Sequence, residues 1–182
     1  MIVMKKDRLI RAVYRNKELK EGQFMGKEGF SVREILEQAV RTEKLGYDFY
    51  SSMAERFKDR VELKDLFETL AKKEQIHEQR FERLEESIGD GETEGWEDVS
   101  EYMRAFVESG FFLGSDKALV RMKEIESIQD AVEFALAFEK ETLLYFLGLR
   151  KTVKEKDIID AIIDEEQSHI TWLNKFKDRF LK

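Results

Sequence analysis

The sequence predicts an all-α protein, a four-helix bundle of two antiparallel helical hairpins joined by a long, partly helical crossover. Four segments carry apolar residues at spacings of three and four, which is typical of helices packed in a bundle. The 182 residues include no proline, the residue that most often interrupts a long helix. Short connections join the first segment to the second and the third to the fourth, which indicates two hairpins.

The first hairpin is expected over residues 32–57 and 63–88. Ser31 and Asp59 are its predicted caps, since each precedes an acidic residue by three positions, and Gly89 is a predicted stop. The core-facing positions of the two helices are Val32, Leu36, Ala39, Glu43, Gly46, Tyr50, Met53 and Phe57, followed by Leu63, Phe67, Leu70, Glu74, His77, Phe81, Leu84 and Ile88.

The second hairpin is expected over residues 128–153 and 159–180. Ser127 and Asp157 are its predicted caps, each followed by an aspartate three positions later. The core-facing positions are Ile128, Val132, Ala135, Glu139, Thr142, Phe146, Leu149 and Val153, followed by Ile159, Ile162, Glu166, His169, Leu173, Phe176 and Phe180.

Residues 89–126 form the predicted crossover, which is too long for a simple turn. It begins with an acidic, glycine-rich loop, GDGETEGWED, and continues with predicted helical stretches at about 99–108 and 115–125. The chain is thus expected to divide into a basic N-terminal extension over 1–30, which is a helix or an arm onto a partner subunit, and a bundle domain over 31–182.

Composition excludes several classes of protein. The net charge is −7, and the first 30 residues hold eight basic and four acidic residues, so the remainder is strongly acidic and a poor match for nucleic acid. The absence of cysteine excludes disulfides, thiolate catalysis and cysteine-ligated metal centres within these residues. No apolar run reaches the ~20 residues of a membrane span, and no signal peptide is recognised, so we expect a cytoplasmic protein without membrane contact.

Polar residues interrupt each apolar stripe near its middle. The first helix of each hairpin has a lone glutamate there, and the second helix has an E-x-x-H motif that contains one of the chain's two histidines. An internal repeat supports the match, because AVRTEKLGYDFY (39–50) aligns with ALAFEKETLLYF (135–146). We call these residues the polar layer: Glu43, Glu74, His77, Glu139, Glu166 and His169.

The polar layer predicts a dinuclear metal site. A glutamate-rich chain can produce E-x-x-H by chance, but here both motifs fall on the core-facing positions. Burying an ionised carboxylate without a partner costs several kcal/mol, and no lysine or arginine occupies a core-facing position at this level. Two divalent cations would balance four carboxylates, and two neutral imidazoles would complete the ligands.

With these residues, the chain resembles the rubrerythrin-like branch of the ferritin-like di-iron carboxylate proteins over about residues 31–180. The segment SEYMRAFVESG in the predicted crossover is also similar to this branch. The resemblance implies a ferritin-like bundle that holds two iron ions per chain. It also implies two bridging glutamates and a terminal glutamate–histidine pair on each ion: Glu74 and Glu166 as bridges, Glu43 with His77, and Glu139 with His169.

Three features depart from the family pattern. Rubrerythrins carry a rubredoxin-type iron domain as electron donor, which these cysteine-free residues cannot form. The family's extra glutamate, one turn after the third-helix ligand and involved in redox-linked metal movement, is Thr142 here, while Glu141 points off the core face. The two irons are therefore expected to stay in place between oxidation states. Tyr50 keeps a tyrosine position of the family, but its repeat counterpart is Phe146, with Tyr145 one position aside.

The expected function is that of a non-haem di-iron oxidoreductase acting on hydrogen peroxide or dioxygen, a rubrerythrin-like peroxidase in oxidative-stress defence. Electrons would come from a separate donor protein, and the chain would form a homodimer. Oxygen-rich ligation suits iron, with manganese or zinc as substitutes. Tyr50 is expected to donate a hydrogen bond to a ligand carboxylate. Two alternatives stay open: a ferroxidase that stores or delivers iron, and a metal-stabilised binding module without catalysis.

Overall fold

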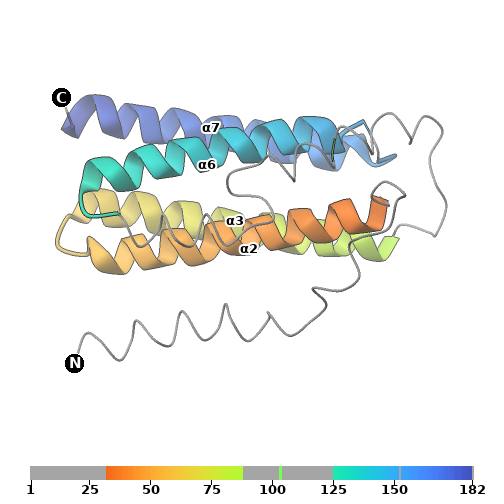
Figure 1. Ribbon diagram of the computed structural model, residues 1–182, viewed down its shortest axis with the longest axis horizontal. Coiled ribbons are helices and arrows are strands. Elements are labelled where there is room, and N and C mark those ends of the chain that lie inside the picture. The colour runs from red at the N-terminus through yellow and green to blue at the C-terminus, as the bar shows by residue number, and fades with distance from the viewer. Residues whose placement is uncertain (1–31, 88–102, 104–124, 152, 182) are drawn as a thin grey trace.

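The computed structural model describes residues 32–87, 103, 125–151 and 153–181, and within them the chain forms four α-helices. Helix α2 spans Val32–Arg56, α3 spans Val61–Ser87, α6 spans Ile128–Leu149 and α7 spans Lys156–Phe180. Figure 1 shows the four helices lying side by side along the long axis of the molecule. The predicted all-α four-helix bundle is confirmed.

The helices pair as two antiparallel hairpins, α2 with α3 and α6 with α7 (Figure 1). Contacts between the hairpins run from α2 to α6 and from α3 to α7. Helix α3 ends and α6 begins at opposite ends of the bundle, which is the connectivity that the predicted crossover requires. The helical stretches expected within the crossover and the extension expected over 1–30 lie outside the described residues.

The predicted cap of α6 is confirmed. The backbone N–H of Asp130 donates to the Ser127 hydroxyl at 3.1 Å, and the backbone N–H of Ser127 donates to the Asp130 carboxylate at 2.8 Å. This reciprocal pair satisfies two amides that the helix itself leaves without partners. It fixes the start of α6 at Ile128.

The caps expected at Asp59 and Asp157 are wrong. Helix α3 begins at Val61, and the carbonyl of Arg60 accepts its first helical bond, from the N–H of Lys64 at 2.9 Å. Helix α7 begins at Lys156, so Asp157 lies inside its first turn. The acid expected to close that capping box, Asp160, instead pairs with the Arg150 guanidinium at the end of α6, at 2.9 Å from Nη2. Ser31 and Gly89 lie outside the described residues.

Two large apolar clusters occupy the described part of the bundle, one on each side of the polar layer. Burying a large apolar side chain stabilises a fold by about 1.5–3 kcal/mol, so these clusters hold the four helices at fixed positions around the layer. Members of the first cluster include Leu36, Phe81, Phe146 and Ile162, and members of the second include Phe49, Phe67, Val132 and Leu173.

The predicted apolar stripe of α7 reaches beyond the buried core. Phe176 is half-buried, and Phe180, the last residue of the helix, is 43% exposed. The Arg179 guanidinium covers the Phe180 ring at 4.8 Å from its centroid. Among the described residues, no helix is long and apolar enough to cross a membrane.

Candidate metal centre

The six residues of the polar layer lie together in the middle of the bundle, and each is fully buried. Every helix contributes at least one carboxylate, and the two histidines come from different hairpins. Residues three apart on a helix share one face, so each E-x-x-H motif presents its glutamate and its histidine to the same space. The contributors are Glu43 on α2, Glu74 and His77 on α3, Glu139 on α6, and Glu166 and His169 on α7.

The polar layer divides into two overlapping groups of four residues. Within each group, one ligand atom per residue lies within 4.8 Å of the others. Glu74 and Glu166 belong to both groups, whereas each lone glutamate and each histidine belongs to one. The groups are Glu43, Glu74, His77 and Glu166, and Glu74, Glu139, Glu166 and His169.

Both histidines turn Nδ1 toward the carboxylates. Nδ1 of His77 lies 2.9 Å from Glu166 Oε1 and 3.4 Å from Glu43 Oε2. Nδ1 of His169 lies 3.3 Å from Glu139 Oε2 and 3.5 Å from Glu166 Oε2. The imidazole rings are roughly parallel, with centroids 5.6 Å apart. Each ring thus directs one nitrogen to its own group and the other nitrogen away from it.

Two carboxylates of the polar layer lack the hydrogen-bond partners that buried carboxylates normally have. Among the described residues, both oxygens of Glu43 and both oxygens of Glu74 have no hydrogen-bond partner. Buried polar atoms without partners are rare in folded proteins, because each loses its hydration without compensation. A cation is the partner that fits an inward-facing set of acceptor atoms.

Burial and mutual repulsion favour the protonated forms of three carboxyl groups of the polar layer. Burial, followed by the Glu166 carboxylate, raises the pKa of Glu43 well above its usual value. Burial and the Glu43 carboxylate do the same for the pKa of Glu74. Burial and Glu166 raise the pKa of Glu139 to about 8. Since metal ligands must be deprotonated, a cation entering the polar layer has to displace these protons.

The histidines offset part of the negative charge. Burial acts to lower the pKa of His169, but the carboxylates of Glu139 and Glu166 outweigh it and raise that pKa to about 10. The pKa of His77 is raised against burial by contact with Glu166. For Glu166, burial acts to raise the pKa, but contacts with Glu139 and the two histidines hold it well below its usual value. These contacts therefore favour the ionised form of Glu166.

Two buried tyrosines lie near the polar layer, and only one touches it. The Tyr50 hydroxyl donates to Glu139 Oε1. The Tyr145 hydroxyl donates to the backbone carbonyl of Ile35 at 2.6 Å, in the neighbouring apolar cluster. The contact of Tyr50 is the one expected from the sequence, and it crosses from α2 to α6.

Small residues sit one turn after each lone glutamate. A Cβ atom at Gly46 would lie 2.7 Å from Glu74 Oε2 and 2.9 Å from Phe138 Cε1, so glycine lets the Glu74 carboxylate lie close to α2. At the matching position of α6, Thr142 is buried and its hydroxyl donates to the Phe138 carbonyl at 2.9 Å. Close packing therefore explains Gly46.

The structure adds three residues to the surroundings of the polar layer. Glu165 Oε2 lies 3.4 Å from His77 Nε2 and accepts from Lys73 Nζ at 2.8 Å, while Glu165 Oε1 accepts from Arg80 Nη1 at 2.7 Å. Burial acts to raise the pKa of Glu165, but Lys73 and Arg80 overcome it and lower that pKa to about 2. The sequence signal was the unequal charge just before the two E-x-x-H motifs, a lysine in one and a glutamate in the other.

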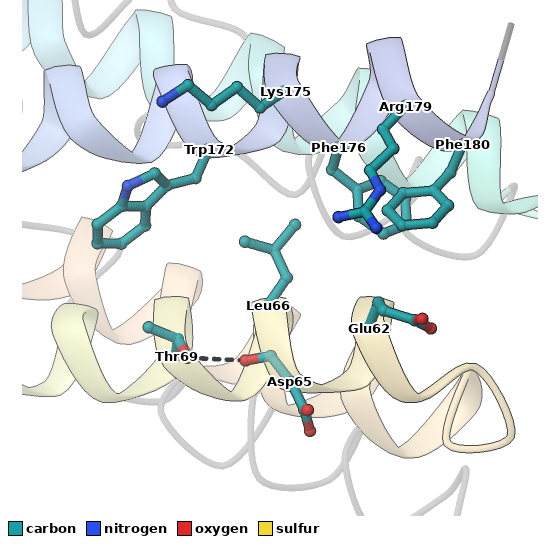
Figure 2. Close-up of a pocket in the computed structure, with 9 residues that line it drawn as sticks. All are labelled: Glu62, Asp65, Leu66, Thr69, Trp172, Lys175, Phe176, Arg179 and Phe180. Atoms are coloured by element: carbon teal, nitrogen blue, oxygen red, sulfur yellow. Dashed lines mark hydrogen bonds between the residues drawn. The ribbon is translucent and has the colours of Figure 1, made fainter.

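A surface hollow lies between the first turns of α3 and the last turns of α7 (Figure 2). Leu66 points from α3 toward α7, and the Thr69 hydroxyl donates to the Asp65 carbonyl at 2.7 Å. No residue of the polar layer lines the hollow. Trp172 connects the two regions, because it lines the hollow and its ring lies 5.6 Å from that of His169, centroid to centroid.

Comparison with known proteins agrees with this arrangement. A crystal structure of a Thermotoga maritima protein, provisionally described as a ferritin-like diiron-carboxylate protein, has a similar fold, with a TM-score of 0.64 and 23% sequence identity over 85% of this chain and 99% of that one. No curated protein matches the chain. The rubrerythrin family model matches residues 34–175, which include the whole polar layer. The chain belongs to the rubrerythrin family.

Proposed function

We propose that the polar layer binds two metal ions and that the protein is a non-haem di-iron oxidoreductase that reduces hydrogen peroxide or dioxygen. The observation that carries this proposal is the membership of Glu74 and Glu166 in both groups of potential ligands. Two ions held by these groups would share the two glutamates as bridges. Glu43 and His77 would complete one position, and Glu139 and His169 the other.

The donor atoms fit two divalent cations. Four carboxylates and two neutral imidazoles balance the charge of two such ions, and each ion would receive three carboxylates and one imidazole. Ligands rich in oxygen favour iron or manganese, whereas structural zinc sites in proteins are mostly built from cysteine and histidine. Family membership favours iron between the two.

When bound, two ferrous ions supply the two electrons that, with two protons, convert one molecule of hydrogen peroxide into two of water. The chain's own residues prepare the site. The apolar clusters on both sides exclude bulk water, and the Tyr50 hydroxyl holds the Glu139 carboxylate in a fixed orientation. Electrons that restore the ferrous state come from a separate donor protein, since these residues hold no cysteine for a rubredoxin-type site.

The assembly and the location belong to the same proposal. We propose that the protein forms a homodimer in the cytoplasm, where it would meet peroxide, which diffuses freely. Sedimentation velocity of the purified protein measures the oligomer directly. A particle of about two chains is expected.

Anaerobic reconstitution followed by rapid mixing tests the function. Apo-protein loaded with ferrous iron should hold two ions per chain and be oxidised by one equivalent of peroxide, faster than by air-saturated buffer. The exposed variant Glu133→Gln serves as a matched control and should react like the wild type. Uptake of many irons per chain in a large particle would favour iron storage instead. Bound iron that peroxide leaves unchanged would favour a non-catalytic metal-stabilised module.

A further inference from the structure

We propose that the two metal positions are inequivalent, and that Glu165 is a positioning residue that makes the Glu43–His77 position bind its ion more tightly than the Glu139–His169 position. This inference rests on the proposed dinuclear centre. It concerns what lies behind each histidine, on the side away from the carboxylates of the polar layer.

Behind His77 lies a carboxylate that is itself held in place. Glu165 Oε2 is 3.4 Å from His77 Nε2, and the same carboxylate accepts from Lys73 at 2.8 Å and from Arg80 at 2.7 Å. These cations come from α3, whereas Glu165 belongs to α7. The side chain of Glu165 is 23% exposed, so this network is screened from water only in part.

His169 has an aromatic neighbour and no such carboxylate. Neither Nε2 atom makes a hydrogen bond within the part of the chain that the structure describes. The difference is that Nε2 of His77 has the Glu165 carboxylate at 3.4 Å, whereas no carboxylate lies within 4.0 Å of Nε2 of His169 among the described residues. The Trp172 ring packs beside it, with centroids 5.6 Å apart. In the repeat register, the residue that would face His169 as Glu165 faces His77 is Lys73, which has no acceptor atom on its side chain.

This difference changes metal affinity for a physical reason. A ligating histidine that donates its outer N–H to a carboxylate is held in one tautomer and one orientation, and its inner nitrogen becomes a stronger donor. Loss of such a partner typically weakens metal binding about 10- to 100-fold. With Nδ1 of His77 on the metal, Nε2 would carry the proton and face the Glu165 carboxylate, 3.4 Å away, which Lys73 and Arg80 hold in position. His169 has no equivalent support.

Equilibrium titration with cobalt(II) measures the two affinities without requiring turnover. Wild-type apo-protein should bind two ions in separable steps. Glu165→Gln should weaken the tighter step about 10- to 100-fold and leave the weaker step unchanged. Glu133→Gln, which removes a carboxylate from an exposed ion pair with Lys177, should change neither step. Equal weakening of both steps by Glu165→Gln, or no weakening, would overturn the proposal.

Combining Glu165→Gln with a second substitution shows which of the two metal positions it weakens. In His169→Gln, the remaining tight site should still respond to Glu165→Gln. In His77→Gln, that response should vanish, because the histidine through which Glu165 acts is gone. If Glu165→Gln were equally damaging without His77, Glu165 would act through the fold or through its charge alone, and the positioning role would be wrong. Arg80→Gln, which frees one Glu165 oxygen, should give a smaller effect of the same kind.

Nitrogen-15 NMR of the zinc-loaded protein gives an independent readout, since the chain has only two histidines. The Nε2–H proton of one imidazole should exchange slowly with water, and Glu165→Gln should accelerate that exchange while leaving the other imidazole unchanged. Identical behaviour of the two rings in the wild type would contradict the inference. A wild-type protein that binds fewer than two ions would overturn the dinuclear centre itself, whereas two ions with no response to Glu165→Gln would overturn only the positioning role.

Discussion

Hairpin α2–α3 and hairpin α6–α7 each bring a lone glutamate and an E-x-x-H motif to the middle of the bundle, but the residues beside these ligands differ. The repeat reproduces the potential ligands at matching positions, and it does not reproduce their supports. The matched pairs are Gly46 with Thr142, Tyr50 with Phe146, and Lys73 with Glu165.

The supports that do exist cross from one hairpin to the other. Tyr50 of the first hairpin donates to Glu139 of the second, and Glu165 of the second lies against His77 of the first. Each hairpin therefore stabilises a residue that its partner supplies. The polar layer therefore needs both hairpins in register, because each hairpin positions a residue of the other.

The largest expected effect is on the number of metal ions bound, which should differ between glutamates that belong to both groups of potential ligands and those that belong to one. Glu74→Ala should abolish binding of both ions, because its carboxylate belongs to both groups, whereas Glu43→Ala should remove one ion. Glu166→Ala and Glu139→Ala should repeat this contrast in the second hairpin. Metal analysis after dialysis measures the number of ions per chain, and Glu133→Ala should retain two. Equal losses from Glu74→Ala and Glu43→Ala would contradict the shared role.

The next effect is that metal binding should reverse the way in which the stability of the fold depends on pH. In the metal-free protein, the pKa of Glu139 is raised from 4.5 to about 8 and that of His169 from 6.5 to about 10, so the folded state binds more protons than the unfolded state in these ranges. The stability of the metal-free protein should therefore fall as pH rises through them. The metal-loaded protein should become more stable as pH rises, because fewer protons compete for the ligands. Urea unfolding with and without chelator measures both slopes, and parallel slopes would count against a buried metal centre.

A smaller effect tests the Gly46–Thr142 pair. Gly46→Ala places a methyl group 2.7 Å from Glu74 Oε2, and overpacking of this kind destabilises a protein by about 1–3 kcal/mol. It should also weaken metal binding, because the Glu74 carboxylate has to move. Thr142→Ser, which keeps the hydroxyl bonded to the Phe138 carbonyl, should cost less in stability and leave metal binding intact. Thermal unfolding of Gly46→Ala and Thr142→Ser, each with and without bound metal, compares the two variants. Equal losses of stability would contradict the expected difference between these positions.

The smallest effect concerns the redox chemistry. Thr142→Glu adds a carboxylate beside the group of Glu139 and His169, at the position where the family pattern has its extra glutamate. Added negative charge should stabilise the more positively charged ferric state and lower the reduction potential. Reductive titration of the wild type and the variant, paired with stopped-flow measurement of the peroxide reaction, gives the comparison. An unchanged potential and rate would make Thr142 an ordinary packing residue.

The four helices, and the fact that the residues of the polar layer come together, could be predicted from the periodic spacing of apolar residues in the sequence. A residue such as Glu74 or Glu166 falls on the core-facing stripe of its helix, and two apolar residues on each side of it fix its level in the bundle. The ends of the helices were harder to predict from the sequence. Asp160 pairs with Arg150, the residue that follows α6, and no local sequence pattern near the start of α7 contains that partner.

The contact between Glu165 and His77 could not be predicted from the sequence, for a related reason. Glu165 lies one position off the core-facing stripe, where a charged residue normally faces water. Its position against His77 depends on the contact between α3 and α7, and on cations contributed by another helix. The exposure of Phe180 is of the same kind, since an apolar stripe does not reveal where the neighbouring helices end.

Anomalous diffraction at the iron absorption edge, from crystals of protein loaded with ferrous iron without oxygen, tests the central claim most directly. Two peaks per chain are expected within the polar layer, one beside Glu43 and His77 and the other beside Glu139 and His169. Glu74 and Glu166 should each contact both. A single peak, or two ions that share neither glutamate, would contradict the account.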